Sequence, residues 1–176
     1  MTTSTTRISG ASQAQVVYRG HPDGETVTVE RSGSQPLRVV ERLPHIAKHS
    51  PTGMGWGYCG SGPADLARSL LIHALGDDSR CTVCDGSNNV VYDTATDTDV
   101  PAQRAHDVAR LDEQLAAARF SPPMACLACE GGWALTPATY QRFKFDVVAG
   151  LPATGWTLTR AEVLTWYQCY RADNPA

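Results

Sequence analysis

The chain has 176 residues, of which 42% are hydrophobic, and its formal net charge at pH 7 is −3. This length suits one domain with an elaboration, and no apolar run reaches the ~18 residues that a membrane-spanning helix needs. The negative charge argues against a protein that binds nucleic acid by bulk charge, whereas a local basic face stays compatible with the composition.

The N-terminal residues 1–14 are rich in Ser and Thr and lack the apolar centre of a signal peptide. We expect them to form a flexible arm that stays on the protein, and we expect the protein to reside in the cytoplasm. The chain contains six cysteines. Four of them occur as two Cys-x-x-Cys pairs, which in a cytoplasmic protein indicates metal binding rather than disulfides.

Three short segments, 15–19, 26–30 and 37–43, are predicted to be the strands of an N-terminal β-meander. In the second segment, Val27 and Val29 alternate with polar residues, which is typical of a half-buried strand. Turn-forming Gly, Pro, Asp and Ser residues separate the segments. The N-terminal part of the core is therefore expected to be a small antiparallel sheet.

A glycine-rich stretch over 53–63 leads directly into a helix predicted over 64–75. Pro63 suits the first helical turn, and Gly62 is then the expected N-cap. Asp65 falls early enough in the helix to reach back toward the cap and the positive end of the helix dipole. The apolar residues recur at three- and four-residue spacing, so this helix is expected to anchor the core.

The segment between the two cysteine pairs contains a predicted helix over 101–119, which the double proline after it ends. Its expected buried stripe consists of Val108, Leu111, Leu115 and Ala118.

The stretch 140–148 is predicted to be a strand, because Phe143, Phe145 and Val147 alternate with polar residues. A second helix is predicted over 159–170. It begins with a capping box in which a Thr is followed three residues later by a Glu.

The two cysteine pairs are predicted to hold a structural zinc ion through Cys81, Cys84, Cys126 and Cys129. A two-residue spacer lets both thiolates of each knuckle point inward, and four cysteine ligands leave no coordination position for water. Gly86 and Gly131 follow the knuckles and allow the backbone to turn so that its N–H groups face the sulfurs. The redox-dithiol alternative is disfavoured, because thioredoxin-type motifs occur singly within a βαβ pattern.

These Cys-x-x-Cys-x-Gly knuckles resemble those of zinc ribbons and of the DnaJ cysteine-rich region. The resemblance covers only the knuckles and implies no chaperone activity.

The glycine-rich loop is open to two interpretations. Backbone N–H groups at a helix N-terminus suit an anion, yet the loop matches neither a Walker motif nor a dinucleotide fingerprint, and its glycines also admit aromatic rings against the backbone. The candidate ligand-binding residues are His49, Trp56, Tyr58, Gly60, Ser61, Gly62 and Lys144.

An enzyme centred on Cys59 or Ser61, with His45 or His49 as the base, is a third possibility. It is disfavoured, because a Cys beside Gly is more often a small buried filler. A nucleic-acid-binding zinc module is a further alternative, with phosphate contacts from Arg80, Arg104, Arg110 and Arg119.

Two stretches together carry a family resemblance: 49–67, HSPTGMGWGYCGSGPADLA, and 140–159, YQRFKFDVVAGLP with WTLT. They resemble a small domain family of unknown function from bacteria, archaea and their phages, whose members carry HSPxGFxWGYxGSGPAQLALALL followed by YQxFKxxVVAxLP and a W-x-L-T. Similar proteins carry Gly at the position of Cys59, which further weakens that residue as a nucleophile. The resemblance implies no activity, and occurrence in phages suggests a role in conflict between a mobile element and its host.

In that family the helix runs almost directly into the second motif, so the cysteine-bearing segment resembles an insertion. The expected organisation is an α+β fold in which a small antiparallel sheet packs on two main helices. Its parts are a flexible arm over 1–14, a discontinuous core over 15–76 and 137–170, a zinc-binding insertion over 77–136 with an extra helix, and a tail over 171–176. The expected function is non-catalytic binding of a small anionic, nucleotide-like ligand or a protein partner.

Overall fold

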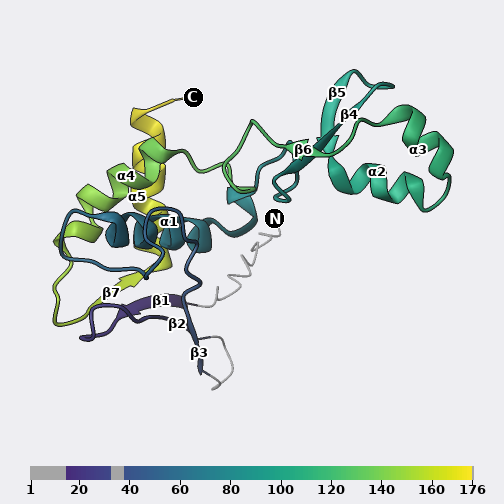
Figure 1. The fold of residues 1–176 in the computed structure, drawn as a ribbon. Coiled ribbons are helices and arrows are strands. Elements are labelled where there is room, and N and C mark those ends of the chain that lie inside the picture. Colours follow the sequence, from purple (N-terminus) through teal and green to yellow (C-terminus); the bar gives the residue numbers. More distant parts are fainter. Residues whose placement is uncertain (1–14, 33–37, 176) are drawn as a thin grey trace, which may run out of the picture.

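A four-stranded antiparallel sheet lies along one side of the molecule, with its strands in the order β3-β2-β1-β7 (Figure 1). The computed structural model describes residues 15–32 and 38–175. The strands of this sheet are β1 (Gln15–Gly20), β2 (Val27–Ser32), β3 (Arg38–Arg42) and β7 (Trp156–Thr159). The expected N-terminal meander is therefore present.

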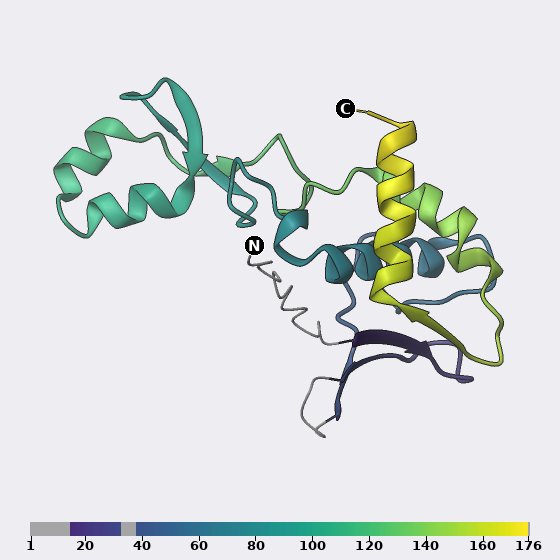
Figure 2. The ribbon, with the colours of Figure 1, turned by 180° about the vertical axis from the view of Figure 1, so that it is seen from behind.

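Three helices pack together on one face of this sheet, as the opposite views in Figures 1 and 2 show. They are α1 (Ser61–Leu75), α4 (Pro137–Asp146) and α5 (Arg160–Asp173). Helix α1 lies at the centre and contacts both α4 and α5. The protein is thus an α+β fold, as expected, and α4 packs on α1.

The core lies between α1 and the inward side chains of the sheet. Tyr18 and Val29 are directly paired across β1 and β2 and are fully buried. Leu66, Leu70 and Leu71 of α1 are fully buried against them. Each buried leucine contributes about 1.5–3 kcal/mol through removal of its surface from water, so α1 anchors the fold.

The start of α1 differs from the expectation. The N-cap is Gly60 rather than Gly62, and Pro63 is the third helical residue. Asp65 therefore lies in the second turn, too far from the cap to interact with it. It is fully buried and turns instead toward the segment before the helix.

The predicted strand over 140–148 is wrong, because these residues belong to α4 and the short 3₁₀ helix η2 (Val148–Gly150). Thr136 caps α4 by accepting a hydrogen bond from the Thr139 backbone N–H, and Pro137 opens the first turn. Phe143 is buried, whereas Phe145 is 57% exposed, so the apparent alternation of aromatic residues does not mark one face.

The expected capping box of the last helix is confirmed. The Thr159 side chain accepts from the Glu162 N–H, and the Glu162 carboxylate accepts from the Thr159 N–H at 2.7 Å. Helix α5 continues to Asp173 and so includes the first residues of the expected tail.

The cysteine-bearing segment extends away from the first sheet as a separate lobe (Figures 1 and 2). It follows the short 3₁₀ helix η1 (Gly76–Ser79) and contains a three-stranded sheet in the order β5-β4-β6. Its elements are β4 (Asn89–Asp93), β5 (Thr98–Pro101), α2 (Ala102–Ala109), α3 (Glu113–Arg119) and β6 (Met124–Ala125).

The single helix predicted over 101–119 is wrong. The chain breaks between α2 and α3, where Asp112 caps α3 by accepting a hydrogen bond from the Leu115 N–H at 2.9 Å. The break turns two residues of the expected stripe outward, since Leu111 is 90% exposed and Leu115 is half exposed, whereas Val108 packs against the core of the lobe. The lobe instead has a small core of Val91, Val100, Ala116 and Phe120.

The division into a discontinuous core over 15–76 and 137–170 and an insertion over 77–136 stays a proposal. The expected arm over 1–14 lies outside the described residues. None of the described helices is long and apolar enough to cross a membrane.

Candidate functional site

Four cysteine sulfurs converge where the lobe leaves the rest of the molecule. The Sγ atoms of Cys81, Cys84, Cys126 and Cys129 all lie within 4.8 Å of one another. Cys81 Sγ and Cys126 Sγ are 3.9 Å apart, and Cys84 Sγ and Cys129 Sγ are 3.6 Å apart. A tetrahedral ion with bonds of about 2.3 Å to sulfur requires sulfurs about 3.8 Å apart, whereas a disulfide requires about 2.05 Å. The spacing fits a shared metal ion and not two disulfides.

Close backbone packing brings the two knuckles together. The Cys81 N–H donates to the Gly132 carbonyl at 2.8 Å. Gly86 and Gly131 have φ values of 76° and 65°, in the left-handed region that glycine favours, so they turn the knuckles as the sequence predicts. Gly132 also has a positive φ, and a Cβ added there would overlap the Gly86 carbonyl. The two knuckles therefore meet backbone against backbone.

The surroundings of the thiols shift their pKa values in opposite directions. Burial alone would raise the pKa of Cys81, but the N–H groups of Cys84 and Val83 outweigh it and lower the pKa to about 7. Burial, with the neighbouring Cys84 sulfur, raises the pKa of Cys129 to about 12. Four thiolates so close together repel one another unless a cation lies between them. The cluster can therefore hold a metal, and an all-sulfur tetrahedral donor set is typical of zinc or iron.

The second knuckle is also held by charged side chains from the core. Arg68 of α1 is 4% exposed and donates to the carbonyls of Ile46 and Glu130 at 3.1 and 3.2 Å. The Lys48 ammonium forms an ion pair with the Glu130 carboxylate. Because Glu130 directly follows Cys129, the cysteine cluster is connected to α1 and to the segment before it.

Asp65 organises that segment. Its carboxylate accepts hydrogen bonds from the backbone N–H groups of Lys48, His49 and Ser50 and from His45 Nε2, at 2.9 to 3.3 Å. Burial alone would raise the pKa of Asp65, but the N–H groups of Ser50 and His49 outweigh it and lower the pKa. The carboxylate is therefore ionised at neutral pH. The sequence signal for this role is a carboxylate among the apolar residues of a helix expected to be buried, which the capping interpretation of Asp65 overlooked.

The glycine-rich loop packs around an aromatic ring. A Cβ added at Gly55, Gly60 or Gly62 would lie 2.6 to 2.7 Å from the nearest atom of Tyr58. Side chains at these positions would displace the ring, which is itself half exposed. The packing interpretation of the glycines thus has a direct structural basis, and ligand binding by Tyr58, Gly60 and Gly62 stays a prediction.

The remaining candidate ligand residues lie around this loop in different environments. His49 Nε2 lies 3.0 Å from the Tyr140 hydroxyl of α4. Trp56 is buried and donates from Nε1 to the Pro152 carbonyl at 3.2 Å. Lys144 is largely buried with its Nζ 4.1 Å from the centre of the Phe145 ring. Ser61 is the exposed first residue of α1.

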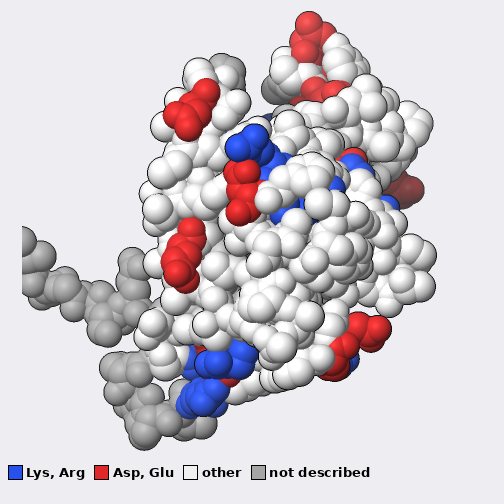
Figure 3. Space-filling view, turned by 90° about the vertical axis from the view of Figure 1, so that its left-hand side faces the viewer, with Lys and Arg blue, Asp and Glu red and all other residues white. Residues whose placement is uncertain are grey.

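Figure 3 shows the side of the molecule on which α1 begins. Most of this face is uncharged, and its Lys and Arg side chains are interspersed with Asp and Glu. An anion bound at the glycine-rich loop would therefore depend on backbone N–H groups and single side chains rather than on a broad basic surface.

The two candidate nucleophiles and the two candidate bases are not hydrogen-bonded to one another. Cys59 and Ser61 are exposed. His45 Nε2 contacts the Asp65 carboxylate, and His49 Nε2 contacts the Tyr140 hydroxyl.

Two of the arginines considered as phosphate contacts are engaged in ion pairs. Arg119 holds the buried Asp93 through two hydrogen bonds of 2.7 Å, which lower the pKa of Asp93 to about 2. Arg80 Nε lies 3.1 Å from Asp77. Arg104 and Arg110 lie exposed on the lobe.

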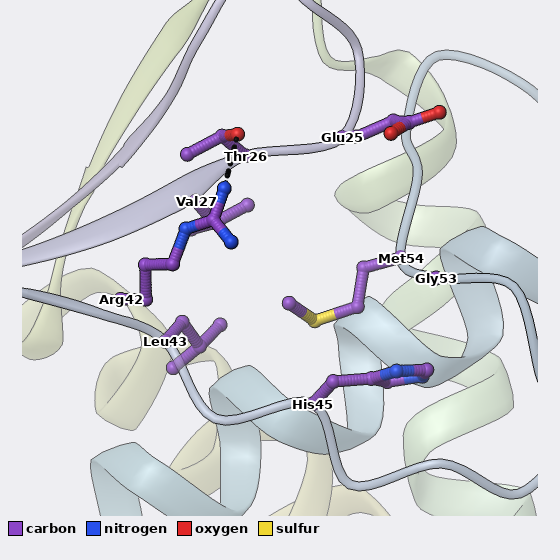
Figure 4. A pocket seen from close by; sticks show the side chains of 8 residues that line it. All are labelled: Glu25, Thr26, Val27, Arg42, Leu43, His45, Gly53 and Met54. Carbon is purple, nitrogen blue, oxygen red and sulfur yellow. Dashed lines mark hydrogen bonds between the residues drawn. The ribbon is translucent and has the colours of Figure 1, made fainter.

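A cavity of about 360 Å³ lies between β2, β3 and the segment before α1 (Figure 4). Leu43 and Met54 line its interior, and the Arg42 guanidinium donates to the Thr26 hydroxyl at 3.2 Å across its top. His45 lies at its edge, and we call this cavity the His45 pocket. Its lining includes one guanidinium, one imidazole and the carboxylate of Glu25.

A profile of the DUF6166 family, a family of unknown function, matches residues 18–110, and the chain belongs to this family. The matched residues contain the first of the two motif stretches, whereas the second, 140–159, lies outside them. No curated protein and no solved structure matches the chain.

Proposed function

We propose that this protein is a non-catalytic binding protein whose cysteine lobe is held by a structural zinc ion on Cys81, Cys84, Cys126 and Cys129. The observation that carries the proposal is the convergence of four Sγ atoms within 4.8 Å. Four protein thiolates complete a tetrahedral zinc shell, which is typical of structural rather than catalytic zinc.

The lobe needs such an ion because its own core is small. Its buried apolar side chains, apart from those beside the cysteines, are Val91, Val100, Ala116 and Phe120. Burial contributes about 1.5–3 kcal/mol for each of Val91, Val100 and Phe120, and the conformational entropy lost on ordering the lobe opposes this gain, whereas structural zinc sites contribute on the order of 10 kcal/mol to folding. Zinc would close the loop between the knuckles and so stabilise the lobe.

The binding role is proposed on chemical grounds. The zinc shell has no open position at which water would be activated. The molecule instead offers cavities with cationic and apolar walls, which suit a small anionic ligand or a segment of a protein partner.

Removal of the metal tests the stabilising role. We expect a strong chelator to lower the midpoint of thermal unfolding, and we expect Cys84→Ser to reproduce the effect. Cys169→Ser is the matched control, since Cys169 is exposed on α5 and outside the cluster. Equal unfolding midpoints for Cys84→Ser, Cys169→Ser and the unchanged protein would contradict the proposal.

Thermal unfolding in the presence of nucleotides tests the binding role. A stabilising ligand raises the midpoint by mass action. The nucleic-acid alternative predicts instead an affinity for DNA or RNA that falls steeply with added salt.

A further inference from the structure

A second cavity, of about 480 Å³, lies where the cysteine lobe meets the core, and we call it the junction pocket. It is formed by β2, the segment before α1, the C-terminal part of α1, and residues adjoining the two knuckles. Its principal lining residues are Arg31, Ile46, Ile72, His73, Arg80 and Trp133. Its size is within the range of about 300–1,000 Å³ of small-molecule sites, which favour the boundary between two parts of a protein.

One wall of the junction pocket is apolar. Ile72 is buried in α1, and Ile46 and Trp133 are partly buried and pack against the core. The position of Trp133 is fixed by backbone pairing: Trp133 pairs with Arg80, and the adjoining Ala134 N–H donates to the Ser79 carbonyl at 2.8 Å. An indole held in this way offers a flat apolar surface on which an aromatic ring can stack.

The lining of the junction pocket also includes the guanidinium of Arg31, which two partners hold in place. Arg31 donates to His73 Nε2 at 3.0 Å and forms an ion pair with Glu41. Since Arg31 can only donate, Nε2 is the acceptor, and the His73 proton lies on Nδ1, 2.8 Å from the Tyr18 hydroxyl. The neutral imidazole accepts from one N–H group of Arg31, and the half-exposed Glu41 carboxylate is the other partner, so an anion bound at Arg31 would compete with Glu41.

Arg80 supplies a second cation at the pocket. Its Nε lies 3.1 Å from the Asp77 carboxylate, but the two side chains are 53% and 91% exposed. Such exposed pairs contribute little, so a bound anion can compete for the Arg80 guanidinium. The lining therefore combines two guanidiniums and one exposed carboxylate with an aromatic wall.

We propose that the junction pocket binds a nucleotide-like ligand, with its aromatic ring against Trp133 and its phosphate at Arg31 and Arg80. This inference rests on the proposed binding function and names its site and ligand class. The junction pocket is favoured over the His45 pocket because the described residues that line the His45 pocket include no Trp, Tyr or Phe and a single guanidinium. Recognition of a ring and a phosphate together requires both features.

Calorimetric titration of the full chain, purified with its metal, tests the proposal. The probes are the four ribonucleoside monophosphates, with adenosine as the ring without the anion and inorganic phosphate as the anion without the ring. We expect at least one monophosphate to bind at least tenfold more tightly than adenosine or phosphate. Trp133→Leu and Arg80→Gln should each weaken that binding about tenfold, which is a typical effect of losing one stacking or charged contact.

Arg110→Gln is the matched control, because Arg110 is an exposed arginine of the same lobe that does not line the pocket. It should bind the monophosphate as the unchanged protein does. Arg80 is exposed, so Arg80→Gln keeps the test valid if Trp133→Leu does not fold.

Zinc content, measured on each sample, separates the two proposals. Protein that contains zinc but binds none of the four monophosphates would overturn the junction-pocket inference and leave the structural zinc proposal standing. Monophosphate binding that Arg80→Gln and Trp133→Leu both leave unchanged would also overturn it. Protein without zinc would contradict the proposed function itself.

Discussion

At the scale of single residues, Asp65 shows how one buried carboxylate determines the course of a loop. Its carboxylate accepts hydrogen bonds from the backbone N–H groups of Lys48, His49 and Ser50, none of which lies in a helix or strand. Buried N–H groups need such acceptors, because an unpaired buried donor costs about 1–3 kcal/mol. The irregular segment between β3 and the glycine-rich loop is therefore fixed by the carboxylate of α1.

We expect Asp65→Ala to lower the free energy of unfolding by about 3–5 kcal/mol, because it leaves the buried Ser50 N–H and the part-buried N–H groups of Lys48 and His49 unpaired. Urea unfolding measures this loss. Asp23→Ala is the matched control: Asp23 also accepts from two backbone N–H groups, of Glu25 and Thr26, but lies exposed in a turn. Its loss should be about 1 kcal/mol or less. Similar losses in the two variants would contradict this role for Asp65.

His73 gives the stability a dependence on pH. Burial, reinforced by Arg31, lowers the pKa of His73 from 6.5. The unfolded chain therefore takes up a proton at a higher pH than the folded protein does, and unfolding becomes more favourable in acid. The contribution of the neutral imidazole is full above about pH 6.5 and is lost as the pH falls through the lowered folded pKa.

We accordingly expect the free energy of unfolding to fall more steeply between about pH 7 and pH 5 in the unchanged protein than in His73→Gln. Urea unfolding at a series of pH values, with metal content checked in each sample, measures the two slopes. Parallel curves would show that His73 does not titrate differently in the folded and unfolded states.

At the scale of elements, α4 is where a sequence pattern and the structure disagree most. Phe143 is 1% exposed and Phe145 is 57% exposed, although a strand would place both on one face. Phe143→Ala should therefore cost about 3–5 kcal/mol of unfolding free energy, and Phe145→Ala well under half of that. Equal costs from chemical unfolding would favour the strand that the alternation predicted.

The elements that are marked by signals between neighbouring residues could be predicted from the sequence. The capping box at Thr159 and Glu162 and the alternation of Val27 and Val29 both depend on neighbouring residues, and both are confirmed. The alternation of Phe143 and Phe145 wrongly predicted a strand, because the packing of α4 on α1 decides which of the two side chains is buried. The cap at Thr136 and Pro137 was the local signal that would have identified α4.

The candidate metal site could be predicted from the sequence, and the junction pocket could not. In each Cys-x-x-Cys pair, the two-residue spacer allows both thiolates to point toward one ion. The spacing alone therefore identified Cys81, Cys84, Cys126 and Cys129. The junction pocket instead brings Arg31, Ile72 and Trp133 together from distant parts of the chain. The spacing of these residues along the sequence does not indicate that they lie together in the fold.

The two knuckles meet so closely that a single methyl group would separate them. A Cβ at Gly132 would overlap the Gly86 carbonyl, whereas the nearest atom to a Cβ at Gly131 is 3.7 Å away. Both glycines have positive φ. We expect Gly132→Ala to weaken zinc binding by about 10–100-fold, as changes around metal ligands often do, and Gly131→Ala to weaken it less. Competition with a chromophoric chelator measures both affinities, and equal values would contradict the close packing of the knuckles.

At the scale of the whole molecule, the cysteine site lies where the lobe and the core join. The lobe extends from this point, while Arg68 and Lys48 hold the second knuckle to α1 and the segment before it. The junction pocket lies beside the same point and takes Arg80 and Trp133 from next to the knuckles. A metal ion held here would stabilise the lobe and, with it, one wall of the pocket.

Elemental analysis of purified protein measures whether one zinc ion joins the two knuckles. Protein prepared under reducing conditions should contain about one zinc ion per chain, and so should Cys59→Ser, whose cysteine lies outside the cluster. Cys84→Ser should contain far less. The account would be contradicted by an unchanged protein that contains no zinc even after zinc is supplied, or by full zinc content in Cys84→Ser.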